Sequence, residues 1–324
     1  MPYGGTMDGP FAMDELEKPS GDDLRRALRE SDAMLGGIEP ILAHLLSAPD
    51  HSLFSDEIVA RVRGMLADLA RQVLRAQAEA TGEKGGDTFA ERHGEPLAEH
   101  FKGLRPLLSH CHALAIEWQL TERLEVQLGI DPVLSPLMQR LVAASETSVS
   151  STAMAALAAQ ARFTQAQRRM ELPLGELPGD LLHQLLSTWQ SYCGETRKDA
   201  VYRAEKKLRQ SFDESNGRLS LFARLLSGRE GASALVLEEA GAGLFFTALA
   251  AHSGQDREIA VLSSHARQTI RLALGLRAAG LEPRRIDEVL LRIHPGAAPV
   301  AGLDAVDQDK ARGMLLDATH RIGR

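Results

Sequence analysis

The residues best suited to chemistry are His110, Cys111 and His112, where histidine and cysteine come closest together. A zinc site needs histidines at i and i+4, as in HExxH, or paired CxxC motifs, and the sequence contains neither. Two histidines at i and i+2 of a helix point roughly 200° apart, so they cannot share one metal ion. We therefore predict no metal site, and we expect one imidazole to be packed and the other solvated.

A phosphoacceptor histidine is a second hypothesis for the same stretch. Such a residue lies exposed on a bundle helix beside a carboxylate. The helix predicted over residues 104–128 offers His110 and His112, with Glu117 further along. The spacing does not distinguish the two histidines, so a signalling bundle with His110 or His112 as the phosphoacceptor is the alternative function.

Motifs for nucleophilic catalysis and phosphate binding are absent from the sequence. It has no GxSxG elbow, no GxxxxGK[ST] loop and no GxGxxG fingerprint. Gly241-Ala242-Gly243 follows no predicted strand, and we interpret it as a helix break. The adjacent carboxylates Glu238-Glu239 point about 100° apart on a helix, which is typical of a solvated face. We predict no catalytic residue and no cofactor, and an enzyme of unrecognised type is the third interpretation.

Two basic clusters supply the candidate interaction residues. Arg168 and Arg169 end a long predicted helix, where cations also complement the negative end of the helix dipole. Arg203, Lys206 and Lys207 lie on another predicted helix, spread around it and not on one stripe. Either cluster fits an acidic protein partner, and a merely structural or solvated role is the competing interpretation.

The negative charge of the chain is confined to its first part. Residues 1–60 hold 12 acidic and 4 basic side chains, whereas the remaining residues hold 32 acidic and 33 basic ones. A neutral body with only 4% aromatic residues argues against nucleic-acid binding. An intramolecular clasp between residues 1–20 and the basic helix around Arg203 is a further hypothesis.

The sequence also indicates the cellular compartment in which we expect the protein. Residues 1–19 lack the basic and apolar regions of a secretory signal, and no apolar stretch reaches the roughly 20 residues of a membrane-spanning helix. The two cysteines, Cys111 and Cys193, cannot form a disulfide framework, which favours a reducing compartment. We expect a cytoplasmic protein that does not bind membranes.

Strong helix formers dominate almost every segment, and no β-branched run alternates with period two, so the sequence predicts an all-α fold. Helices are expected over residues 22–35 and 56–80, and a glycine-rich loop over residues 82–94. A helical stretch over residues 97–128, interrupted near Gly103 and Pro106, comes next.

Gly129 ends this helical stretch. Asp131 is then expected to cap the next helix, with Pro132 in its first turn. We place the domain boundary at this point.

After residue 129 the predicted helices come in pairs about 40 residues apart, the length of HEAT or armadillo units. The pairs match in helix length and not in residue identity, so an irregular bundle is the alternative. The pairs are 133–144 with 149–169, 180–192 with 199–213, 219–227 with 232–251, and 258–279 with 284–293. The predicted organisation is a flexible acidic arm (1–20), an N-terminal helical bundle (21–128), a HEAT-like helical domain (129–295), and a linker with a C-terminal helix (296–324).

Several of these stretches resemble one known family. They are Asp131-Pro132-Val133, AALAAQAR at 155–162, RRMELPL at 168–174, and LALGLRAAGL at 272–281. They are similar to alphaproteobacterial proteins that carry the domain of unknown function DUF2336, over roughly residues 129–295. The resemblance implies an all-helical, HEAT-like bacterial cytoplasmic protein, and it supplies no catalytic residues to carry over.

These observations together favour a non-enzymatic helical scaffold or regulatory module. Stacked helix pairs expose an extended surface, and we expect that surface to bind another protein. A homodimer formed through the apolar stripe of residues 56–80 is an alternative, although an intramolecular bundle would use the same stripe.

Overall fold

The computed structural model describes residues 21–33, 56–82, 85–194, 198–228 and 231–322, and all of the secondary structure in these ranges is helical. The all-α prediction is therefore confirmed. One helix covers residues 21–33 (helix 21–33). The other α-helices are α2 (Asp56–Thr81), α3 (Gly86–Phe101), α4 (Arg105–Leu128), α5 (Pro136–Val142), α6 (Thr147–Arg168), α7 (Gly179–Cys193), α8 (Lys198–Ser211), α9 (Arg218–Leu226), α10 (Leu237–Ser253), α11 (Arg257–Leu262), α12 (Thr269–Ala278), α13 (Pro283–Ile293) and α14 (Gln308–Ile322).

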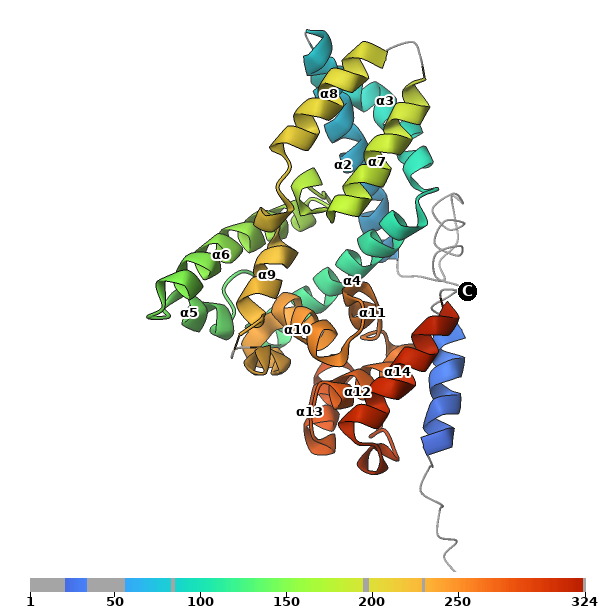
Figure 1. Ribbon diagram of the computed structural model, residues 1–324, viewed down its shortest axis with the longest axis vertical. Helices are drawn as coiled ribbons and strands as arrows, with labels where there is room; N and C mark the ends of the chain where they lie inside the picture. Colours follow the sequence, from blue (N-terminus) through green and yellow to red (C-terminus); the bar gives the residue numbers. More distant parts are fainter. Residues whose placement is uncertain (1–20, 34–55, 83–84, 195–197, 229–230, 323–324) are drawn as a thin grey trace, which may run out of the picture.

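The helices form three parts (Figure 1). An upper lobe contains α2, α3, α7 and α8. A lower lobe contains α9 to α14 together with helix 21–33. The hairpin of α5 and α6 projects to one side as an arm, and α4 runs from the upper lobe to the lower one. Among the described residues, no helix combines the length and apolar character needed to cross a bilayer.

Each lobe has its own cluster of buried apolar side chains, and α4 contributes to both. Leu107 and Leu114 of α4 lie in the upper core, whereas Leu120 and Leu124 lie in the lower core. Residues from both sides of residue 129 enter each core, so the two cores are not divided at the predicted boundary. Helix α4 therefore packs into both lobes, and α6 does so too, with Ala156 in the lower core and Phe163 in the upper core.

The helix predicted over residues 56–80 is confirmed as α2, and its apolar stripe is buried. Helices α3 and α8 pack against it. The apolar stripe of α2 therefore packs against other helices of the same chain, which is the intramolecular interpretation of this helix. The five predicted core residues of α7 are also buried: Leu181, Leu182, Leu185, Leu186 and Trp189.

Polar side chains of α2 bind the last turn of α6 and the segment that follows it. Nη1 of Arg61 donates to the carbonyl of Gln167 (2.8 Å). The carboxylate of Asp68 accepts from the backbone N–H of Leu172 (3.1 Å), and Nε2 of Gln72 donates to the carbonyl of Leu172 (2.8 Å). These bonds satisfy backbone groups that would otherwise lack partners. They anchor the base of the arm to the upper lobe.

The loop predicted over residues 82–94 is wrong over most of its length, because α3 begins at Gly86. The reason is tertiary packing of α3 on α2. A Cβ at Gly94 would lie 3.3 Å from Cγ of Arg71, so this glycine allows the two helices to approach closely. Arg75 of α2 also pairs with Asp87 in the first turn of α3 (2.6 Å). Packing thus overrides the low helix propensity of glycine.

The break after α4 lies where the sequence predicted it, but the next helix begins later than expected. Gly129 ends α4 with φ 66°, a conformation that favours glycine. The carboxylate of Asp131 accepts from the backbone N–H groups two and three residues further on, so it holds a turn. Ser135 caps α5 by accepting from the N–H of Met138. The predicted start near Pro132 is therefore corrected to Pro136.

The helix pairs do not stack in the order of the sequence. The pair α7–α8 packs against α2 and α3, whereas α6 packs against α9. In a solenoid each repeat contacts its neighbours in the chain, and α7–α8 departs from that rule. Apolar side chains of α7 and α8 join those of α2 and α3 in the upper core, which accounts for this packing.

The helix predicted over residues 258–279 is divided in the structure. Helix α11 ends at Leu262, a short 3-10 turn follows, and α12 begins at Thr269. The hydroxyls of Ser263 and Ser264 donate to carbonyls three residues earlier, and such local bonds compete with a continuing helix. The predicted break in α10 is confirmed, because Gly241 has φ 69° inside that helix.

Candidate interaction surfaces

The predicted interaction residues Arg168 and Arg169 lie exposed at the C-terminal end of α6. Nε of Arg169 lies 2.8 Å from the carboxylate of Glu171, and Nη2 of Arg168 lies 4.0 Å from that of Glu125. Ion pairs between exposed groups contribute little to stability. Both guanidinium groups therefore remain accessible to a partner.

The basic residues of α8 are placed differently. Nη2 of Arg203 donates to the carbonyl of Ala80 (3.1 Å), and Nζ of Lys207 donates to the carboxylate of Glu79 (2.8 Å). Both acceptors lie near the C-terminal end of α2, so these two cations contact α2 at the solvent-exposed edge of the α2–α8 interface, whereas Val201 and Ala204 of α8 are buried in the core beneath. Lys206 is exposed.

The clasp predicted for residues 1–20 lies outside the described residues. Residue 21 itself lies in the lower lobe, where a Cβ on Gly21 would be 3.0 Å from Nζ of Lys310. Helix α8 belongs to the upper lobe (Figure 1).

His110 and His112 are both buried, with 2% and 3% of their surface exposed. The expectation that one of them is solvated is therefore wrong. The reason is that α4 is covered by α2 on one side and by α10 and α11 on the other. The phosphoacceptor alternative needs an exposed imidazole, and neither histidine provides one.

A carboxylate nevertheless lies beside His110. Nδ1 of His110 is 2.9 Å from Oε1 of Glu258, and this hydrogen bond holds the pKa of Glu258 at about 2. Nε2 of His110 is buried and makes no hydrogen bond within the described part of the chain. Burial lowers the pKa of His112 to about 4, so that imidazole is neutral at neutral pH. The pair of His110 and Glu258 joins α4 to α11.

The centre of the molecule contains a buried ion network built on Glu117 of α4. Its carboxylate lies 2.5 Å from Nη1 of Arg218 and 2.7 Å from Nη2 of Arg257. Burial alone would raise the pKa of Glu117, but the two guanidinium groups hold it at about 2. Arg218 also stacks on Phe163 of α6, 3.6 Å from its ring centroid. The network therefore ties α4, α6, α9 and α11 together.

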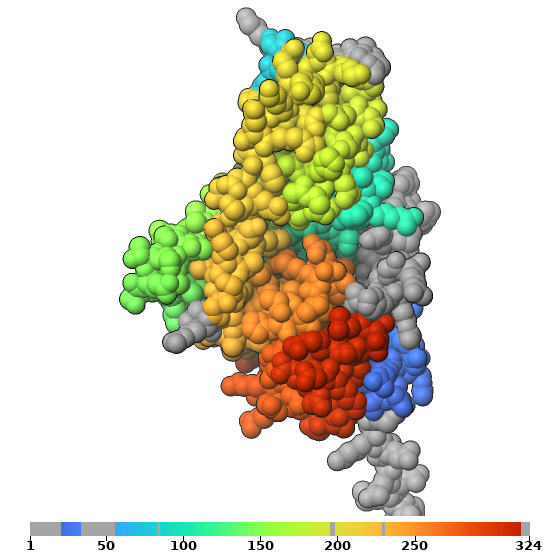
Figure 2. Space-filling model, in the orientation of Figure 1, coloured from blue at the N-terminus to red at the C-terminus, as the bar shows by residue number. Residues whose placement is uncertain are grey.

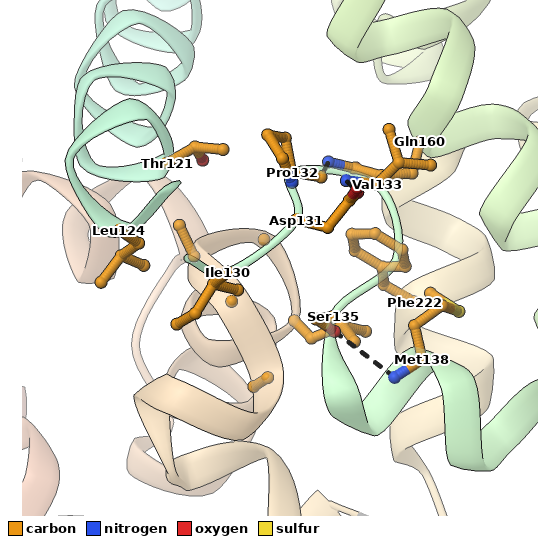
Figure 3. A pocket seen from close by; sticks show the side chains of 15 residues that line it. Thr121, Leu124, Ile130, Asp131, Pro132, Val133, Ser135, Met138, Gln160 and Phe222 are labelled. Carbon is orange, nitrogen blue, oxygen red and sulfur yellow. Dashed lines mark hydrogen bonds between the residues drawn. The ribbon is translucent and has the colours of Figure 1, made fainter. Parts of the chain in front are cut away.

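A small pocket opens beside this network, where α4, the arm and α10 meet (Figure 3). Gln160 of α6 lines it and also accepts from Nη1 of Arg218 (3.3 Å). The kinked backbone around Gly241 forms another wall. The cavity volume is about 20 Å³, which holds about one water molecule. A pocket of this size suits a water molecule that bridges polar groups.

The solvent side of α6 forms a continuous exposed surface, which we call the α6 face. It carries no carboxylate, because α6 contains no Asp or Glu, and its basic residues gather towards one end. Met154 at its centre is 53% exposed. Figure 2 shows the outer end of the arm projecting to one side of the molecule, while the rest of the arm packs against neighbouring helices. The α6 face consists of Thr147, Ser151, Met154, Ala155, Ala158, Ala161, Arg162, Gln165 and Arg168.

A second surface lies in the lower lobe, where helix 21–33 docks. Nε and Nη2 of Arg271 donate to the two carboxylate oxygens of Asp32, at 2.6 and 2.7 Å. Leu24 and Leu28 of the same helix enter the lower core. The sequence reasoning missed this contact, since Asp32 and Arg271 are 239 positions apart. The spacing of Leu24, Leu28 and Asp32 on one helical face is the signal that could have indicated a docked helix.

Metal ligands do not cluster in the part of the chain that the structure describes, where no group of three or more His, Cys, Asp or Glu side chains could hold an ion. Cys111 is fully buried, and burial raises the pKa of its thiol to about 12. Cys193 is half-buried.

The chain was compared with known proteins at three levels. No protein-family model, no curated protein and no solved structure matches it. The resemblance to the DUF2336 family therefore stays a prediction.

Proposed function

We propose that this protein is a non-enzymatic helical scaffold that binds another protein through the α6 face. The observation that carries the proposal is an exposed helix face, free of carboxylates, on an arm that projects from the body. Exposed helix faces usually carry mixed charges, and an accessible apolar centre with a polar rim is typical of an interaction site.

The composition of the α6 face also describes its partner. Ala155, Ala158 and Ala161 have small side chains that allow the backbone of a partner helix to approach closely. Met154 adapts its shape to apolar neighbours. Arg162 and Arg168 favour carboxylates at the end nearest the lobes. The expected partner is an amphipathic helix with an acidic end.

The test compares retention of partner proteins by three versions of the full chain. Wild type, Ala158→Glu on the α6 face and Ala251→Glu on α10 are immobilised and exposed to lysate of the source cells. Both alanines are exposed, so neither substitution disturbs a core. We expect Ala158→Glu to reduce retention of a partner at least tenfold, with an unchanged melting temperature, and Ala251→Glu to retain it. Equal retention by all three versions contradicts the proposal.

The proposal does not extend to phosphotransfer. A phosphoacceptor imidazole must present a ring nitrogen to a phosphate donor. His110 has a carboxylate neighbour in Glu258, but its Nε2 atom is buried. The burial of both candidate histidines therefore favours the scaffold.

A further inference from the structure

Helix 21–33 contacts the lower lobe through only one of its faces. Leu24, Leu28, Ser31 and Asp32 are buried, and they follow the i, i+4, i+7, i+8 spacing of one helical stripe. The residues between them, such as Arg29 and Glu30, are exposed. A helix that buries four side chains is held weakly compared with a core helix. Its docking thus resembles the binding of a peptide helix.

The surface on which helix 21–33 docks requires a carboxylate from its ligand. We call this surface the Arg271 surface. It is made by η6 (Ala266–Gln268), α12 and α14. Arg271 is fully buried, and Nη1 donates to Gln255 (2.8 Å) while Nε and Nη2 bind Asp32. A buried guanidinium without a carboxylate partner is strongly unfavourable. Any helix on this surface must therefore supply a carboxylate at this position.

A second contact binds the polar end of helix 21–33. Nε2 of Gln268 donates to the carbonyl of Ser31 (2.6 Å), and its Oε1 accepts from the Ser31 hydroxyl. That hydroxyl also lies 3.3 Å from the carbonyl of Arg267. Gln268 thus satisfies a carbonyl in the last turn of helix 21–33, where carbonyls lack intrahelical partners. The recognised pattern is Leu-x3-Leu-x2-Ser-Asp.

The chain that links helix 21–33 to α2 is long. Residues 34–55 separate them, and 22 residues can span roughly 70 Å when extended. A connection of this length does not by itself place the helix on the Arg271 surface. The side-chain contacts must do so. Because helix 21–33 is tethered to the rest of the chain, it competes with a separate ligand as if it were present at a millimolar concentration.

We propose that the Arg271 surface is a binding site for a partner protein's helix with two leucines one turn apart and a carboxylate one turn later. Helix 21–33 is the internal ligand that occupies this site and restricts access to it. The proposal concerns a different surface from the α6 face and does not depend on it.

The test uses the full chain and a fluorescent peptide with the sequence of residues 20–34. A variant with Leu24→Ala, Leu28→Ala and Asp32→Ala weakens the internal ligand and leaves the Arg271 surface unchanged. Fluorescence anisotropy should show at least tenfold tighter binding of the peptide to this variant than to wild type. A peptide with Asp32→Asn should bind at least tenfold more weakly, whereas Glu30→Gln, on the exposed side, should bind normally.

A second measurement covers the case in which the triple variant does not fold. A protease site is placed within residues 34–55 of the otherwise unchanged chain, and the chain is cleaved. Excess wild-type peptide should displace the cleaved fragment, and the Asp32→Asn peptide should not. The proposal is overturned if the fragment never exchanges, or if both peptides displace it equally. Dimers that swap helix 21–33 would also overturn it, because they assign the surface to a second copy of the chain.

Discussion

Gly64 of α2 lies directly against the backbone of Met170, which follows α6. A Cβ on Gly64 would be 2.6 Å from the carbonyl oxygen of Met170, closer than such atoms approach in proteins. Met170 itself has φ 56°, in the left-handed region that non-glycine residues rarely adopt. The absence of a side chain at residue 64 therefore lets the base of the arm dock on the upper lobe.

Gly64→Ala should destabilise the protein although alanine is the better helix former. The added methyl group must displace backbone, which costs about 1–3 kcal/mol. Gly313→Ala is the matched control, because Gly313 lies exposed in α14 with open space around it. That change should stabilise by about 0.5–1 kcal/mol. Urea unfolding measures both, and stabilisation of the same size by both variants would refute the close contact.

Glu117→Gln should lower the free energy of unfolding by about 3–5 kcal/mol, because it leaves Arg218 and Arg257 without their buried counter-charge. The exposed pair of Arg285 and Glu288 provides the control, and Glu288→Gln should change stability by less than about 1 kcal/mol. Chemical denaturation at pH 7 compares the two variants. A small effect at Glu117 would mean that the network does not hold the four helices together.

The lowered pKa of Glu117 predicts that the protein loses stability in acid. The pKa of Glu117 falls from its ordinary value of 4.5 to about 2 on folding, so its contribution is complete above pH 4.5. The contribution is lost as the pH falls towards 2. Wild type should therefore lose more stability than Glu117→Gln between these pH values.

The burial of His112 predicts a separate loss of stability at milder pH. Its pKa falls from 6.5 to about 4 on folding, because the imidazole is buried. The unfolded chain then binds more protons, so the contribution of His112 to stability is complete above pH 6.5 and falls by roughly 3 kcal/mol as the pH drops to 4. Urea titrations at intermediate pH values should show this slope. His112→Gln should make the slope shallower without removing it, because burial also lowers the pKa values of His265 and His294. An unchanged slope in His112→Gln would contradict the prediction.

The two thiols should differ in reactivity. Cys111 is buried with a pKa of about 12, whereas Cys193 is half-buried at the end of α7. A thiol reagent such as DTNB should modify one cysteine per native chain and two after unfolding. In Cys193→Ser the native signal should disappear. Rapid modification of native Cys193→Ser would show that the upper core opens readily.

Local pattern was sufficient to predict the helical class and many element bounds. The apolar stripe of α2 recurs at helical spacing, and that spacing alone predicts one buried face. The breaks at Gly129 and Gly241 follow from the left-handed conformations that glycine adopts without strain. These features depend on residues that are neighbours in the chain, so they can be predicted from local sequence.

How the helices pack against one another depends on contacts between distant segments. The glycines at residues 85, 86 and 94 predict a loop when the local sequence is considered alone. Packing against α2 makes most of this stretch helical. His110 and His112 are both buried because α4 is enclosed from two sides, which no helical periodicity could show. Asp32 meets Arg271 across 239 positions, and the free energy of that pair comes from burial that the fold creates. Contacts between distant segments depend on which elements pack together, and that choice is made by the whole chain.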